Sequence, residues 1–422
     1  MKRAALAGIL VAAGLLSLWA GPDKEKGSAR DLVDEEPQAS GREAEQGSGQ
    51  GAAKQLSGAA GGAQPRGSEQ PAVDKKIGEM AYLDGEVGVS RSGRRMDSRD
   101  IAMGMDVENF DYVSTGENGS AEIEITSEVC PGALLRVDPR TTFYLEITRV
   151  NEATDTTQVS VLRGSLMFKV KKITGDQEVL VRTDNTVLGV RGTEFRVLMS
   201  PGGDTLVSCR EGVVEVRDEE RAVTAEPGRV VEKLSGGSLR AVSVALDELE
   251  RYERDWFAGR IEALESNALR ATRYYASQYD RRAREFRESF LDMVEQNGDT
   301  IARWVEEDRE GRTGGAVELM QQKKELIGDL FRVKRQITML ERVYYRLLEL
   351  GGYHARGVGQ GELSDGSSTA EFFRRFEGER AELEQDMLYV RYTMMLYARR
   401  NDGTFPADEL SGEEFLGGAG SF

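Results

Sequence analysis

The fold is decided by the stretch Val190-Arg191-Gly192-Thr193-Glu194-Phe195-Arg196-Val197. Gly192 permits a turn or bulge, and the Thr193 hydroxyl can bond to the backbone of that turn. Because side chains alternate along a strand, Phe195 and Val197 share one face with Thr193, and we expect them to enter a core. We therefore interpret this stretch as a folding signature, and a binding role for Arg191 or Glu194 stays open.

Short strands led by glycine surround this stretch on both sides. The recurring unit is a glycine, any residue, an apolar residue, any residue and a second apolar residue. Gly85, Gly164 and Gly212 each lead such a unit, and Gly116-Glu117-Asn118-Gly119 predicts a hairpin. Because the unit recurs at unequal spacing, a strict solenoid is excluded. The pattern predicts an all-β domain over residues 74–242, either a compact sandwich or an irregular β-roll.

These motifs, taken in order, resemble the FecR family. The signature stretch has the family's V-R-G-T-x-F-x-V pattern, and the glycine-led strands on either side are similar to its neighbours. The residues that carry this fold signature are Gly164, Arg191, Gly192, Thr193, Phe195, Val197, Gly212 and Gly228. The resemblance implies an exported β-domain that contacts a protein, or a glycan, in the bacterial envelope.

The best-known members of this family are membrane-spanning regulators. Their FecR region senses an outer-membrane siderophore transporter, and a cytoplasmic segment controls a sigma factor. In this sequence only Met1 to Arg3 precede the apolar run Ala4 to Ala20, so we expect no direct anti-sigma activity. Residues 1–20 are predicted to be a signal peptide or an uncleaved N-terminal anchor, and membrane contact is expected only if they are retained.

Residues 21–73 are rich in Gly, Ala, Ser, Gln and charge and contain no aromatic residue. Such a segment cannot bury enough apolar surface to offset its ordering entropy, so a disordered linker is predicted. These features together predict an exported protein of the periplasm, the cell envelope or the extracellular space.

Residues 243–400 change to a helical period. One heptad seam runs through Leu319, Leu326, Val333, Leu340 and Leu347, and further apolar stripes precede and follow it. Each seam must be buried against another helix, which predicts a three-helix bundle or a coiled-coil hairpin. Self-association through these helices is an option, and residues 401–422 are predicted to form a flexible tail.

Composition excludes some function classes. The chain has a formal net charge of −17 and no basic stripe, so nucleic acid is not expected as a partner. We predict no catalytic, cofactor-binding or metal site. The single histidine, His354, is expected in a solvated loop, and the acids Asp106, Glu108 and Asp111 are expected to be solvated.

The remaining residues of chemical interest have structural interpretations. Trp256 and Trp304 are expected to pack the helical bundle. Cys130 and Cys209 can form a disulfide in an oxidising compartment, or Cys209 is a small buried hydrophobe beside Val207.

Two functional hypotheses follow. The first is a non-enzymatic protein-interaction or scaffold module of the envelope, whose partner is a protein or a glycan. The alternative is a sensory component of iron or envelope-stress signalling that acts through a separate regulator. An envelope hydrolase is a third class, but no carboxylate pair in the sequence is persuasive enough to name.

Overall fold

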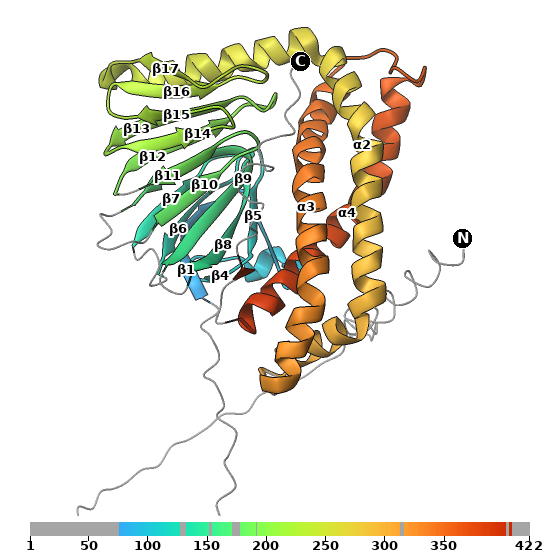
Figure 1. Ribbon diagram of the computed structural model, residues 1–422. Helices are drawn as coiled ribbons and strands as arrows, with labels where there is room; N and C mark the ends of the chain where they lie inside the picture. Colours follow the sequence, from blue (N-terminus) through green and yellow to red (C-terminus); the bar gives the residue numbers. More distant parts are fainter. Residues whose placement is uncertain are drawn as a thin grey trace, which may run out of the picture. The chain divides into compact units, whose positions relative to one another are not determined.

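A computed structural model describes residues 76–126, 132–151, 154–170, 178–190, 192–312, 316–401 and 405–406. The predicted signal segment, the predicted linker, Cys130 and Arg191 lie outside these residues. The described residues form one compact unit, in which a β region is followed by long helices (Figure 1). The protein therefore has an α+β fold.

The β region begins at Lys76 and its main part ends at Ser243. Its strands are β1 (Lys76–Asp84), β2 (Val87–Arg91), β3 (Arg94–Arg95), β4 (Asp106–Glu108), β5 (Tyr112–Thr115), β6 (Ser120–Ile125), β7 (Ala133–Val137), β8 (Thr142–Asn151), β9 (Thr154–Lys169), β10 (Glu178–Arg182), β11 (Val187–Val190), β12 (Glu194–Met199), β13 (Thr205–Glu211), β14 (Val214–Arg217), β15 (Ala222–Ala225), β16 (Arg229–Lys233), β17 (Arg240–Ser243) and the distant β18 (Phe405–Pro406). The helices are η1 (Ser98–Asp100), η2 (Leu246–Glu248), α2 (Leu249–Arg309), α3 (Ala316–Ala355) and α4 (Thr369–Arg399).

The strands form two sheets that share β9. One sheet has the order β4-β1-β6-β7-β9-β12-β13-β16-β17 and is antiparallel throughout. The other has the order β3-β2-β5-β8-β9-β10-β11-β14-β15, in which β9 and β10 are parallel neighbours, and the short β18 also pairs in parallel with β8. Apolar residues from both sheets meet in a single core, which includes Val190 and Val197.

The chain passes between the two sheets at corners that contain glycine. Gly85, Gly164, Gly192, Gly212 and Gly228 all lie at such crossings, and all have positive φ. At Gly164, in the middle of β9, a Cβ atom would lie 2.5 Å from the Thr141 Cα and 2.7 Å from the Arg140 carbonyl oxygen. The corner therefore requires a residue with no side chain. Of the two architectures that the sequence left open, the irregular β-roll describes this path.

The hairpin predicted at Gly116–Gly119 is wrong. β5 pairs with β2 and β8, whereas β6 pairs with β1 and β7, so the turn carries the chain from one sheet to the other. The Gly116 N–H donates to the Glu86 carbonyl at 2.8 Å, which attaches this corner to the one that precedes β2. The local sequence specifies a tight turn, but the partners of the flanking strands are set by packing far along the chain.

The signature residues lie in the core. Phe195 and Val197 are fully buried, and the Phe195 ring stacks on Phe168 with centroids 4.7 Å apart. Thr193 is also buried, but its hydroxyl has no hydrogen-bond partner among the described residues, in contrast to the expected bond to the turn. Instead its methyl carbon packs against Gly212, where a Cβ atom would lie only 2.6 Å from it. Thr193 therefore contacts the corner at Gly212 by close packing.

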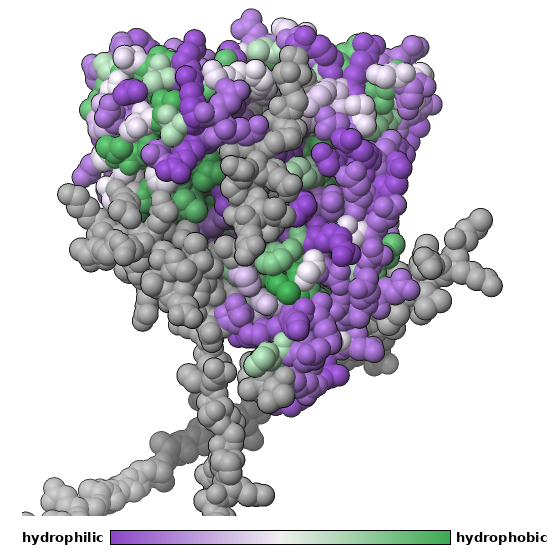
Figure 2. Space-filling view, viewed as in Figure 1, coloured by the Kyte–Doolittle hydropathy of each residue, from purple (hydrophilic) through white to green (hydrophobic). Residues whose placement is uncertain are grey.

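Three long helices pack against one another beside the sheets (Figure 1). The predicted seam is buried at Leu326, Val333, Leu340 and Leu347, and Phe376 of α4 contacts Tyr344 of α3 with ring centroids 5.5 Å apart. The face of the helices that Figure 2 shows is mainly hydrophilic. Self-association through the seams would require the bundle to open, because the seams are already covered within the chain, and it stays a prediction.

The first turns of α2 lie on the outer face of a sheet, which was not expected. Trp256 packs with Leu198, Leu206 and Val230 of β12, β13 and β16, so its predicted place in the bundle is wrong. The neighbouring Glu253, only 4% exposed, accepts hydrogen bonds from Ser208 and Arg196 of the sheet. Trp304, by contrast, is fully buried in the bundle beside Tyr397, as predicted.

His354 is not in a solvated loop. It lies in the last turn of α3, where its Nε2 is 3.0 Å from the Thr369 hydroxyl and its ring lies 4.8 Å from that of Phe373. The glycines before it suggested a loop, but the helix continues through Gly351 and Gly352 to Ala355. The histidine thus connects the end of α3 to the start of α4.

Candidate binding site between the sheets and the helices

The second half of the β-roll has two kinds of connection at its opposite ends. Glycine corners join strands of different sheets, whereas four hairpin turns join neighbours within a sheet. These hairpin turns are residues 183–186, 200–204, 218–221 and 234–239. Because each strand runs from a corner to a hairpin, all four hairpin turns gather at one end of the roll.

A cavity of about 550 Å³ opens between these hairpins and the helices. Each of the four hairpins contributes to its wall, with Asp184, Gly203, Asp218 and Ser235 as examples. From the helices, α2 supplies Tyr274, Tyr275, Gln278 and Arg282, and α3 supplies Met339, Arg342 and Val343. The volume lies within the range of known ligand sites, and the wall combines aromatic rings with amide, carboxylate and guanidinium groups.

Hydrogen bonds between the hairpins hold them in register. The Asn185 amide donates to the Gly203 carbonyl at 3.0 Å and accepts from the Thr205 hydroxyl at 3.0 Å. The Ser235 N–H donates to the Asp204 carboxylate at 2.7 Å, which ties the second hairpin to the fourth. This wall of the cavity is therefore built from cross-braced turns.

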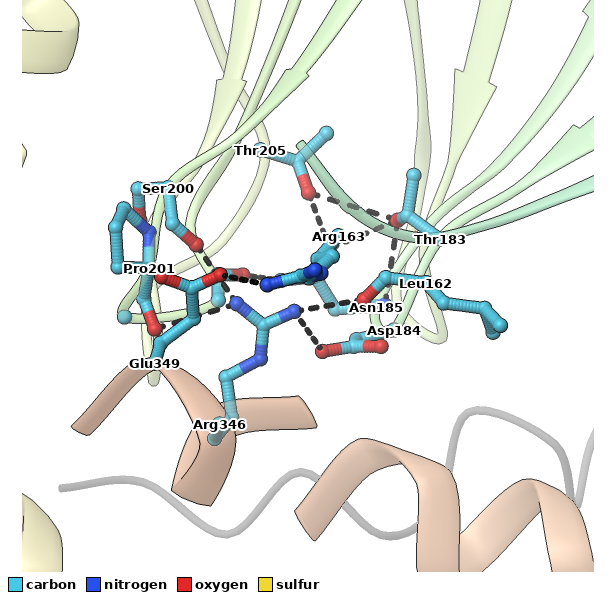
Figure 3. Close-up of polar contacts among 12 residues, drawn as sticks. Leu162, Arg163, Thr183, Asp184, Asn185, Ser200, Pro201, Thr205, Arg346 and Glu349 are labelled. Carbon is cyan, nitrogen blue, oxygen red and sulfur yellow. Dashed lines mark hydrogen bonds and ion pairs between the residues drawn. The ribbon is translucent and has the colours of Figure 1, made fainter. Parts of the chain in front are cut away.

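Arg346 of α3 fastens the helices to this end of the roll (Figure 3). Its guanidinium group is 1% exposed, and it donates to the carbonyl oxygens of Ser200 at 2.8 Å and Leu162 at 3.0 Å. It also forms an ion pair with Asp184 at 3.2 Å. One turn along the helix, Glu349 pairs with Arg163 of β9 at 3.1 Å. Because Asp184 lines the cavity as well, the same ion pair joins the two walls.

Burial and pairing set the charge states around the cavity. Burial raises the pKa of Asp184, although the nearby Arg346 and Arg342 oppose this change. Burial alone would also raise the pKa of Asp218, but hydrogen bonds from Lys233 and from two backbone N–H groups hold it below its usual value. Burial raises the pKa of Tyr275, so this tyrosine stays protonated at neutral pH. The cavity thus offers both donors and acceptors at pH 7.

Two of the three acids that were expected to be solvated, Glu108 and Asp111, are not, whereas Asp106 is exposed as expected. Asp111 is 1% exposed rather than solvated, and it accepts from Arg91 Nε at 2.9 Å and from the Glu108 N–H at 2.8 Å. Glu108 in turn pairs with Arg399 of α4 at 3.1 Å. These acids are therefore structural partners that join β2, the turn after β4 and the last helix.

The described residues of the predicted fold signature do not line the cavity. They lie at the corners or in the core, and Arg191 is outside the described residues. The cavity residues were missed because hairpin turns rich in Thr, Asp, Asn, Ser and Gly look like ordinary surface turns. One signal was available on α3, where Arg342, Arg346 and Glu349 form a second stripe, at helical spacing, beside the apolar seam.

Within the part of the chain that the structure describes, no group of three His, Cys, Asp or Glu residues could hold a metal ion. No described helix is both long and apolar enough to cross a bilayer. Cys209 is buried, and burial raises the pKa of its thiol to about 11. A disulfide between Cys209 and Cys130 stays a prediction, because Cys130 lies outside the described residues.

Comparison with known proteins agrees with the motifs. The family model described as FecR protein matches residues 111–215, so the chain contains a FecR-type region. This region begins at the buried Asp111 and ends in β14, and it includes the shared strand β9. The match supports a role related to envelope signalling.

No curated protein matches the chain. Two crystal structures of a proposed anti-sigma factor from Parabacteroides distasonis are similar to it, each with 18% sequence identity and a TM-score of 0.28. In both cases the similarity covers 33% of this chain and 63% of that chain. At this TM-score the likeness does not bear on function.

Proposed function

We propose that the chain is a non-enzymatic, exported interaction module of the bacterial envelope, and that its partner binds in the cavity between the hairpins and the helices. The observation that carries this proposal is the joint construction of the cavity. Four hairpins and two helices form its wall, and the buried ion pair between Arg346 and Asp184 fixes the helices to the hairpins.

The wall is suited to binding more than to catalysis. Its buried charges are used in internal pairs, such as Asp218 with Lys233 at 2.6 Å, and these pairs fix the shape of the site. The two tyrosines and Gln278 supply flat apolar surface with polar edges. Such a mixture recognises a polar segment of protein or a glycan.

A crosslinking experiment in intact cells tests the site. A photo-reactive amino acid at Gln278, in the cavity wall, should capture the partner, whereas one at the exposed Glu288 of the same helix should not. Equal capture from both positions, or none from Gln278, would contradict the proposal.

A cavity-filling pair of variants makes this test specific. Gly237 lines the cavity, and a Cβ there would meet its nearest neighbour at 3.5 Å, so Gly237→Trp adds bulk to the wall without a backbone clash. It should abolish capture from Gln278. Gly378→Trp, on the exposed face of α4, where a Cβ meets nothing within 4 Å, is the matched control and should leave capture unchanged.

The export part of the proposal has its own test. Fractionation of the native cells should recover the protein from the periplasm or the envelope. Recovery from the cytoplasm would overturn this part.

The FecR match favours a second candidate, a sensory component that acts through a separate regulator. In that case Gly237→Trp should change the transcriptome of the native cells in the same direction as deletion of the gene. An unaltered transcriptome in the deletion strain would exclude this candidate and leave the interaction module.

A further inference from the structure

The short strand β18 lies beyond the last helix and returns to the β-roll. It pairs in parallel with β8, where Phe405 is opposite Thr148 and Pro406 is opposite Arg149. A ladder of two residues is a weak attachment, yet the Phe405 side chain is 0% exposed. The buried ring therefore holds this segment in place.

The pocket around Phe405 is built from three separate parts of the fold. The rings of Phe110, Phe331 and Tyr397 lie at 6.3, 5.9 and 5.5 Å from it, with interplanar angles of 82°, 87° and 63°. These residues belong to the turn before β5, to α3 and to α4. The edge-to-face contacts are specific to an aromatic occupant, because an aliphatic side chain lacks the charge distribution that favours them.

A lysine selects further for an aromatic ring. The Lys334 Nζ lies 4.7 Å from the centroid of Phe405, and the same Nζ donates to Glu146 of β8 at 2.9 Å. Glu146 is fully buried, so the ammonium group is held over the ring rather than free to leave it. A fixed cation over an aromatic face is a recognition element.

The backbone at Phe110 is strained toward this pocket. Its φ is +67°, a region that bulky residues rarely adopt. Its N–H donates to the Leu145 carbonyl of β8 at 2.9 Å, and its ring contacts Phe405. Strain of this kind persists where the surroundings require one orientation, and it is concentrated at ligand sites.

We propose that the edge of β8 and this aromatic pocket form a docking site for an extended protein segment that carries a phenylalanine followed by a proline. In this structure the chain's own Phe405-Pro406 occupies the site. Parallel pairing with an exposed strand edge, together with a side-chain pocket, is a known mode of peptide recognition. Because Phe405 follows α4 by only a few residues, the internal segment has a high effective concentration, and a partner segment must compete with it.

The docking site is independent of the cavity between the hairpins and the helices. The two sites share none of the residues named for either one, so one can fail its test while the other holds.

A binding experiment with the full-length chain tests this proposal. The probe is a fluorescein-labelled peptide of residues 401–410, Asn-Asp-Gly-Thr-Phe-Pro-Ala-Asp-Glu-Leu. Phe405→Ala in the protein empties the pocket, so fluorescence anisotropy should show this variant binding the peptide at least tenfold more tightly than the wild-type protein. A peptide with alanine in place of its phenylalanine should not bind, and Lys334→Met added to the variant should weaken binding severalfold.

Two results would overturn the proposal. The first is a Phe405→Ala protein with the circular dichroism of the wild type that does not bind the peptide. The second is equal binding by the wild-type and variant proteins. If Phe405→Ala does not fold, Phe405→Leu replaces it, because leucine fills the pocket without edge-to-face or cation–π contacts. The peptide should then bind Phe405→Leu more tightly than the wild type, and equal affinity would refute the docking site.

Discussion

Replacing Arg346 by methionine should separate the helices from the hairpin end of the roll. The change removes donors to the Ser200 and Leu162 carbonyl oxygens, at 2.8 and 3.0 Å, and leaves Asp184 without its ion-pair partner. Removing one member of a buried pair costs about 3–5 kcal/mol. The Asp184 side chain keeps 18% exposure, so water relieves part of that cost. We expect the free energy of unfolding to fall by about 3 kcal/mol.

Denaturant unfolding with tryptophan fluorescence measures this loss, and two tryptophans report on different places. Trp256 lies on the outer face of the sheet and Trp304 in the bundle. Variants that keep only one of them should show whether Arg346→Met loosens the sheet contact before the bundle. The control is Arg356→Met, because Arg356 is exposed and its guanidinium group rests on the Tyr353 ring, at 4.5 Å, so a loss below about 1 kcal/mol is expected.

A double variant distinguishes the ion pair from lost packing. Asp184→Asn removes the carboxylate that has lost its ion-pair partner, although the nearby Arg342 still offsets part of its charge, so adding it to Arg346→Met should recover about 1–2 kcal/mol of the loss. The reasoning is refuted if Arg346→Met costs less than about 1 kcal/mol, or if the double variant is less stable than Arg346→Met alone.

Three further predictions concern stability. Gly164→Ala should lower the free energy of unfolding by at least about 2 kcal/mol in denaturant, because its Cβ would lie 2.5 Å from a backbone atom and its φ is +89°. The control Gly378→Ala, on an open face of a helix, should raise the free energy of unfolding by up to about 1 kcal/mol. Equal effects of the two variants would contradict the corner argument. Burial raises the pKa of Asp386 to about 7, with Glu382 adding to the shift and Arg287 opposing it, so the folded state keeps a proton that the unfolded chain releases near pH 4. The free energy of unfolding should therefore fall as the pH rises from about 4 to 7. Asp386→Asn should flatten this fall and raise the free energy of unfolding by about 1–2 kcal/mol at pH 8. Thermal melts of both proteins at pH 5 and pH 8 would detect or exclude this effect. Asp111→Asn should destabilise the protein by about 2 kcal/mol, because Arg91 loses the more buried of its two charged partners and keeps only its ion pair with Glu108 at 3.3 Å. An unchanged melting temperature would show that the pair of Arg91 and Asp111 contributes nothing.

The sequence predicted the parts of the fold that depend on local pattern. The glycines of the recurring unit do adopt positive φ, and the leucine seam of residues 319–347 is buried at all but its first position. It could not predict which strands pair, because tight turns have the same composition whether they join neighbours or cross between sheets. Gly116–Gly119 shows this limit, since its turn is real but its strands belong to different sheets.

Neither the packing of α2 on the sheet nor the cavity could be predicted from local sequence pattern. A helical apolar stripe that contains Trp256 can pack against another helix or against a sheet. In this protein it packs against the sheet, because the outer face of β13 is apolar and must also be buried. Arg346 and Asp111 were hidden for a different reason. Charged residues are normally exposed, so the stripe of Arg342, Arg346 and Glu349 on α3 indicates a polar helix face without showing that it is buried, and Asp111 has no comparable signal.

The opposite ends of the β-roll have different consequences for its evolution. The corner at Gly164 lies against the backbone of the corner between β7 and β8. Because β9 belongs to both sheets, a residue added at Gly164 would displace both of them. The hairpins at the other end close strands within one sheet and can change in length without altering either register. Among relatives, insertions and deletions should therefore accumulate in residues 183–186, 200–204, 218–221 and 234–239, the loops that form the cavity wall. The choice of ligand can then diverge while the scaffold stays constant.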